Sequence, residues 1–110
     1  MRRSYLGEFE LMVLLALIQL EDDAYGVPIS RELAKRRGHD VSLGSVYAAL
    51  DRLEKKGLVS STLGDPTPER GGRAKRYFRA TRAGLRQARE TRQTLTKLWR
   101  ALPELKGEHA

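Results

Sequence analysis

The sequence predicts a mainly α-helical domain with a small β-hairpin, arranged as a winged helix-turn-helix plus a long C-terminal dimerisation helix. Two observations carry this prediction. Three helical segments precede two β-prone runs, and one further helical segment follows them. The charge is also uneven, because residues 70–89 contain eight bases and no acid, whereas residues 1–30 contain five acids and two bases. Such a basic stretch favours a polyanionic partner, with nucleic acid ahead of a membrane surface.

Length and composition exclude several classes of protein. The 110 residues, with a formal charge of +7, suffice for one compact domain. The absence of cysteine, with only His39 and His109 as histidines, excludes disulfides and a Cys/His zinc site and predicts a reducing, cytoplasmic compartment. The longest apolar run, residues 11–18, is too short to span a bilayer, so no membrane anchor is expected. No nucleophile, metal-ligand set or phosphate loop is recognisable, so we predict neither an enzyme nor a cofactor or metal.

The first two helices are expected at residues 6–20 and 26–37. Asp23 is a candidate cap for the second helix, and Gly38 fits its end. Apolar residues cover nearly every face of residues 11–18, so one face is expected in the core and the other against a second subunit. The residues predicted at this subunit interface are Leu6, Phe9, Met12 and Val13.

The third helix has the clearest boundaries, with Ser42 as its cap and Gly57 at its end. Its inward stripe is expected to contain Leu43, Val46, Leu50 and Leu53. The opposite face is small and hydroxylic first and basic later, which suits the major groove. Ser45 is expected to bond a base edge, and Ala49 to contact a thymine methyl. The DNA-binding residues predicted here are Ser42, Ser45, Ala49, Arg52, Lys55 and Lys56.

These three cations have alternative explanations. Asp51 and Glu54 are close enough to Arg52 to offer it a surface ion pair, but such pairs are weak, so DNA contact is the favoured role of Arg52. Lys55 and Lys56 are also favourable at a helix C-terminus without any ligand.

Residues 58–63 and 75–80 are predicted to form the strands of a hairpin with a long tip. Prolines and glycines in the tip restrict and shape the loop, so that its bases are preorganised. The cluster holds more charge than an edge strand needs to prevent aggregation, so we expect arginine at the wing tip in the minor groove, with Lys75 and Arg76 nearer the backbone. These wing residues are Arg70, Arg73, Lys75 and Arg76.

Thr81 is expected to cap the final helix. Its apolar residues follow a heptad frame, which is typical of a helix that packs on a partner helix. The interface residues predicted here are Leu85, Ala88, Leu95, Leu98, Trp99 and Leu102. We therefore divide the chain into a DNA-binding domain at residues 1–80, a dimerisation helix at 81–102 and a tail at 103–110.

Three segments resemble the PadR family of bacterial winged-helix transcriptional regulators, in its short form with one C-terminal helix. They are LGEFELMVLLALIQLEDDAYGVPI, DVSLGSVYAALDRLEKKGLV and GGRAKRYFRATRAG. The likeness covers residues 6 to about 102. It implies a homodimer whose C-terminal helices pack across one another, and repression by binding an operator in double-stranded DNA. It also implies that Tyr47, in the VYxxL pattern, is a DNA-binding residue that reaches a phosphate.

The resemblance also implies release by an effector, for which a small aromatic or hydrophobic molecule is the candidate. Trp99 is able to stack on a planar ligand. In drug-binding members of the family, however, the pocket tryptophan lies about one turn earlier, where this chain has Leu95. Packing is therefore the favoured role of Trp99, and both residues are candidates for an effector site.

Two alternatives stay open at this point. A winged-helix adaptor would bind another protein through its first and last helices, without specific DNA binding. A regulator of the MarR or ArsR kind would share the DNA-binding mechanism, but the short chain and the DAYG and GGRxKRYF motifs argue against it.

Overall fold

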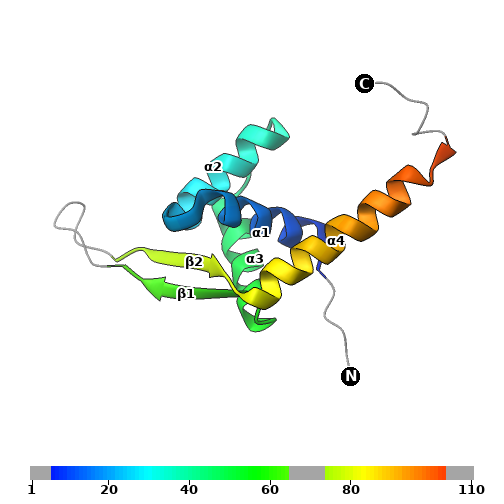
Figure 1. Cartoon of the computed structure of the whole chain (residues 1–110). Coiled ribbons are helices and arrows are strands. Elements are labelled where there is room, and N and C mark those ends of the chain that lie inside the picture. Colours follow the sequence, from blue (N-terminus) through cyan, green and yellow to red (C-terminus); the bar gives the residue numbers. More distant parts are fainter. Residues whose placement is uncertain (1–5, 65–73, 104–110) are drawn as a thin grey trace.

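Helices and strands follow one another in the predicted order (Figure 1). The computed structural model describes residues 6–64 and 74–103. Within these ranges the elements are α1 Glu8–Leu20, the short 3-10 helix η1 Glu21–Asp23, α2 Gly26–Arg37, α3 Leu43–Lys55, β1 Val59–Leu63, β2 Arg76–Ala80 and α4 Arg82–Arg100. The mainly α-helical fold with one antiparallel hairpin is confirmed.

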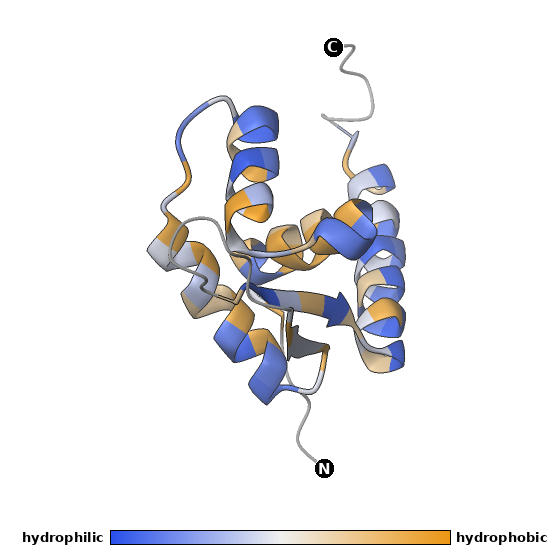
Figure 2. Ribbon diagram, turned by 90° about the vertical axis from the view of Figure 1, so that its left-hand side faces the viewer, coloured by the Kyte–Doolittle hydropathy of each residue, from blue (hydrophilic) through white to orange (hydrophobic). Residues whose placement is uncertain are grey.

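The core lies where α1, α2 and α3 meet, and α1 runs through it as an almost wholly apolar helix (Figure 2). The hairpin closes one side of this core through Phe78. The largest fully buried side chains are Val13, Leu14, Leu17, Ile29, Val46, Leu50 and Leu53. The α3 members of this set recur at helical spacing, as the sequence predicts.

Hydroxyl side chains cap α3 and α4 as expected. The Ser42 Oγ accepts the Ser45 amide at 3.2 Å, and the Thr81 Oγ1 accepts the Gly84 amide at 3.0 Å. Gly38 ends α2 with a φ of 80°, in the left-handed region that a glycine adopts without strain. These contacts fix where the third helix and the long last helix begin.

The predicted cap at Asp23 is wrong. Tyr25 occupies the N-cap position of α2, and no side chain makes a capping hydrogen bond there. Asp23 lies in η1, where its carbonyl oxygen accepts the Tyr25 amide at 3.2 Å. The 3-10 turn therefore inserts backbone where the sequence suggested a side-chain cap, and it leaves the α2 N-terminus next to the hairpin.

The hairpin is joined to the helical part of the fold at the middle of β2 and just after its C-terminal end. Its register runs from Val59 opposite Ala80 to Leu63 opposite Arg76. The Ala24 carbonyl accepts the Phe78 amide at 2.8 Å, which ties β2 to the start of α2. The Leu58 carbonyl accepts the Thr81 amide at 3.0 Å, which ties β1 to the start of α4.

The start of α4 approaches β1 so closely that only glycine fits. A Cβ atom built on Gly84 would collide with the carbonyl oxygen of Leu58, which is backbone and has little freedom to move. Beyond this contact α4 extends away from the body of the molecule (Figure 1).

We predict that Gly84→Ala destabilises the fold by about 2 kcal/mol or more, because the new methyl group overpacks a backbone contact. Gly44→Ala is the matched control, since Gly44 also lies in the first turn of a helix but meets only the Ser42 Oγ, at 3.5 Å. The control is expected to be neutral or to stabilise by about 0.5 to 1 kcal/mol through helix propensity. Urea unfolding monitored by circular dichroism measures both, and equal stability of the two variants would contradict the close contact.

Candidate nucleic-acid interface

The exposed face of α3 is the centre of the candidate interface. Ser45 and Ala48 are exposed early on this helix, and Arg52 and Lys55 are exposed later. Ser42, at the cap, is exposed too. The early side chains are small, so α3 is able to approach a surface closely at its N-terminal half and to meet negative charge at its C-terminal half.

One predicted base-contacting residue is misplaced. Ala49 is fully buried, so the prediction that it meets a thymine methyl is wrong. It follows Val46 by three residues and precedes Leu53 by four, which puts it on the apolar stripe. Leu43, expected in that stripe, is 40% exposed instead. Ala48 is the small residue that the exposed face presents.

A buried carboxylate holds two cations of α3. Glu10 of α1 accepts the Arg52 Nε–H at 2.6 Å and the Lys56 Nζ at 2.6 Å. The Glu10 side chain is 8% exposed, whereas that of Arg52 is 50% exposed. Asp51 and Glu54, the alternative partners that the sequence offered for Arg52, pair with other residues. Asp51 pairs with Lys55 at 3.2 Å, and Glu54 accepts the Ser61 hydroxyl at 2.7 Å.

The ion pairs hold Glu10 in its charged form. Burial by itself would raise the pKa of this carboxyl. Hydrogen bonds from Lys56, Arg52 and the Gly7 amide, with the charge of Lys56, outweigh burial and lower the pKa from 4.5 to about 2. The carboxylate is therefore a fixed negative charge at any pH near neutrality.

Tyr47 places its hydroxyl at the first turn of α2. Its ring lies over Gly26, where a Cβ atom would collide with the Tyr47 Oη. The side chain is 45% exposed, so it combines packing with an accessible polar end. Because a helix N-terminus carries partial positive charge, this position favours an anion near the tyrosine hydroxyl.

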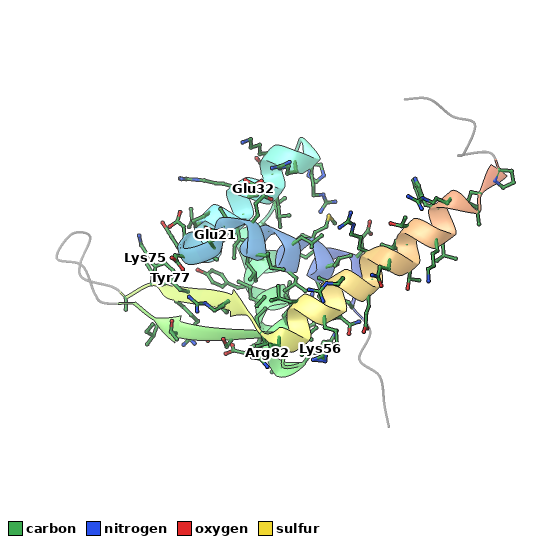
Figure 3. The ribbon with its side chains drawn as sticks, in the orientation of Figure 1. Glu21, Glu32, Lys56, Lys75, Tyr77 and Arg82 are labelled. Atoms are coloured by element: carbon green, nitrogen blue, oxygen red, sulfur yellow. The ribbon has the colours of Figure 1, made fainter. Side chains whose placement is uncertain are left out.

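The base of the wing is built on two tyrosines. The Lys75 Nζ lies 4.5 Å from the centroid of the Tyr25 ring and donates to the Tyr25 hydroxyl at 3.3 Å. Tyr25 also meets Tyr77 edge-on, with the ring centroids 5.4 Å apart. Figure 3 shows Tyr77 on β2 and Lys75 just before the start of this strand. The role of Tyr25 was not predicted, because no local sequence pattern pairs residues so far apart in the chain.

The remaining wing residues divide into two groups. Arg76 donates from Nη1 to the Ser61 hydroxyl across the hairpin at 2.9 Å. Arg70 and Arg73 lie outside the described residues. Within the described part of the wing, these contacts therefore orient the side chains of Lys75 and Arg76.

The predicted subunit-interface residues also divide. Val13 is fully buried within one chain, so the prediction that it contacts a second subunit is wrong. Ala88 is nearly buried at 8% exposure, which leaves it little surface for a partner. Leu6, Phe9 and Met12 are partly buried against the core. Predicted interface residues on α4 and just after it remain 40% to 64% exposed: Leu85, Leu95, Leu98, Trp99 and Leu102.

A cavity of about 390 Å³ lies between α1 and α4. Its lining is apolar on both helices, with two arginines on α4, and comprises Leu11, Leu15, Ala88, Arg89, Arg92, Leu95 and Thr96. Of the two candidate effector residues, Leu95 lines this cavity and Trp99 does not.

Across the described residues 6–64 and 74–103, no helix combines the length and the apolar character required to cross a membrane. The His, Cys, Asp and Glu side chains of the same ranges do not gather in threes at any site suited to a metal ion.

Comparisons with known proteins agree with the fold. The sequence model of the Transcriptional regulator PadR-like family matches residues 14–90. Transcriptional regulator Rv3488 of Mycobacterium tuberculosis is 38% identical over 82 residues, which are 73% of this chain and 70% of that protein. A PadR-like transcriptional regulator from Bacillus cereus superposes with a TM-score of 0.71 at 29% identity, covering 92% of this chain and 93% of its own. A PadR family regulator from Eggerthella lenta gives 0.70 at 29% identity, covering 93% and 88%.

The buried Glu10 should make stability depend on pH in a specific way. Glu10→Gln is expected to lower the free energy of unfolding near neutral pH by about 2 to 3 kcal/mol. Because the folded pKa is depressed, this contribution is complete above 4.5 and is lost as the pH falls toward about 2. Urea unfolding of both proteins at about pH 7 and about pH 3 should therefore give a difference that shrinks with acid. Asp51→Asn, which removes an exposed ion pair, is the control and should change little. A Glu10→Gln difference that is constant with pH would contradict the charged pair.

Proposed function

Because the chain belongs to the PadR-like family of transcriptional regulators, we propose that it is a homodimeric repressor that binds a near-palindromic operator in double-stranded DNA. Residues 1–80 provide the DNA-binding domain and residues 81–102 the dimerisation helix. The family consists of transcriptional regulators and not of enzymes. The observation that carries the proposal is the exposed face of α3, which is small at its start and basic at its end, beside a basic wing.

In this proposal α3 enters the major groove. Ser45 bonds a base edge, and Arg52 and Lys55 meet the phosphate backbone. Tyr47 supports the proposal because its hydroxyl lies at the N-terminus of α2, which favours a phosphate. Lys75 and Arg76 contact the backbone at the wing, and Arg70 and Arg73, from the tip, enter the minor groove.

The exposed apolar side chains of α4 support the dimer. A surface that leaves Leu95 50% and Trp99 64% exposed at heptad spacing is typical of an interhelical seam. Packing α4 across the partner subunit would bury this seam and hold the two recognition helices about 34 Å apart, one turn of DNA. The protein would act in the bacterial cytoplasm, where its operator lies.

Release by a small aromatic or hydrophobic effector completes the proposal. The apolar cavity between α1 and α4 supports this part, because a ligand there would alter how α4 sits on the body. Leu95 is the candidate contact. Trp99 is a candidate only if the partner subunit brings it to the cavity.

Selection from a random duplex library should yield a near-palindromic site that binds two subunits. Fluorescence anisotropy is then expected to give a large preference for that duplex over its scrambled version. With about four phosphate contacts per subunit, the logarithm of affinity should fall with the logarithm of salt at a slope of roughly −7. Lys75→Gln should make this slope shallower by about 2 per dimer, while Lys97→Gln, on α4, leaves it unchanged. Equal binding of selected and scrambled duplexes would favour the protein-interaction adaptor.

Charge on the exposed face of α4 should dissociate the dimer. Leu95→Glu together with Trp99→Glu is expected to give a monomer in analytical ultracentrifugation, because two carboxylates would be buried at the seam. Gln93→Glu adds a charge to an exposed position outside the heptad frame and should leave the dimer intact. The double variant should also bind the selected duplex more weakly, since one subunit engages a single half-site. Retention of the dimer by the double variant would exclude this face as the interface.

A further inference from the structure

Glu10 is the buried charged residue of the described chain, and its burial needs a reason. Removing a carboxylate from water is costly, and an apolar residue would close the α1–α3 contact at less cost. No unsatisfied buried side-chain atom is left among the described residues, so the ion pairs are complete within the protein. Replacing a whole buried ion pair by apolar residues is often neutral for stability, so stability alone does not account for this one, although removing a single partner is destabilising.

The contacts of Arg52 show that Glu10 orients its guanidinium group. Its Nε–H points inward to Glu10 at 2.6 Å, while half of the side chain stays exposed. A guanidinium is a planar fork, so fixing Nε fixes the direction of the terminal amino groups. Among the described residues these amino groups have no protein partner, and they are left for an external acceptor.

The position of Arg52 on α3 suggests that acceptor. Arg52 follows Ser45 by seven residues, two turns of helix, so the two share the exposed face. An arginine at the later turn of a helix that enters the major groove lies toward its edge, where phosphate oxygens accept two parallel hydrogen bonds. A guanidinium already held in place loses less freedom when it binds than a free one.

We propose that Glu10 is a positioning residue for DNA binding, which holds Arg52 by its Nε–H so that the terminal amino groups clamp a backbone phosphate. This inference rests on the proposed function. Glu10 itself does not contact DNA. Lys56, held by the same carboxylate, partly shields its charge from the phosphates. Figure 3 shows Lys56 at the end of α3, beside the first turn of α4.

The sign of the Glu10→Gln effect tests the proposal. Simple electrostatics predicts tighter binding when a negative charge near DNA is removed. Positioning predicts the opposite, a loss of about tenfold in affinity for the selected duplex, because Arg52 becomes free to reorient. Glu54→Gln is the matched control: it removes a carboxylate from α3 that bonds Ser61 and not Arg52. Its affinity should equal or exceed that of the wild type.

A double-mutant cycle then assigns the effect to Arg52. Arg52→Gln should weaken binding about tenfold, and Glu10→Gln combined with Arg52→Gln should be no weaker than Arg52→Gln alone within about twofold. Multiplicative losses, or a Glu10→Gln variant that binds as tightly as Glu54→Gln, would overturn the proposal. Circular dichroism at the assay temperature establishes that each variant is folded.

Arg52→Lys decides the matter if Glu10→Gln does not fold. Lysine keeps the positive charge, but its donors all lie on one nitrogen, so it cannot bond Glu10 and also form two parallel hydrogen bonds to a phosphate. It should therefore bind nearly as weakly as Arg52→Gln, whereas wild-type affinity would overturn the proposal. A wild-type protein that does not distinguish the selected duplex from its scrambled version would overturn the proposed function and this inference together. Specific wild-type binding with unaltered variants overturns the inference alone.

Discussion

Burial of α1 is the interaction on which the rest of the structure depends. This helix contributes Val13, Leu14 and Leu17 to the core, and both α2 and α3 pack against it. Burying three such side chains contributes on the order of 5 kcal/mol, a large part of the net stability of a small domain. Helix α3 is held in place by this contact with α1, by its contact with α2 and by its contact with β1.

Two other faces of α1 contribute to the contact with Arg52 and to the lining of the cavity next to α4. Glu10 faces α3 and holds Arg52, whereas Leu11 and Leu15 line the cavity that faces α4. Because a helix is rigid over a few turns, a change in how α4 lies on α1 would reach Arg52 through a single element. Coupling between assembly and DNA binding would then need no long pathway, only a shift of α1 relative to α3.

Local signals predicted the fold well, and long-range contacts account for what they missed. Ser42 and Thr81 act within three residues of themselves, so their capping roles follow from sequence. The pairing of Glu10 with Arg52 spans 42 positions, and nothing near either residue indicates it. Ala49 was misassigned for a different reason: a small residue beside an apolar stripe fits both faces of a helix, and only the tertiary structure shows that it is buried in the core.

The apolar side chains on the exposed half of α4 are not buried by any contact within the described part of a single chain. Gly84 and Ala88 anchor its first turns, but the later residues Leu95, Leu98 and Trp99 face solvent. An isolated helical segment of this length is marginal in water, and its apolar side chains add an unfavourable exposed surface. A partner helix would remove both costs. In the proposed dimer, the angle at which α4 leaves the Gly84 contact would then set the distance between the recognition helices, so the close approach of Gly84 to Leu58 would bear on the half-site spacing that the protein selects.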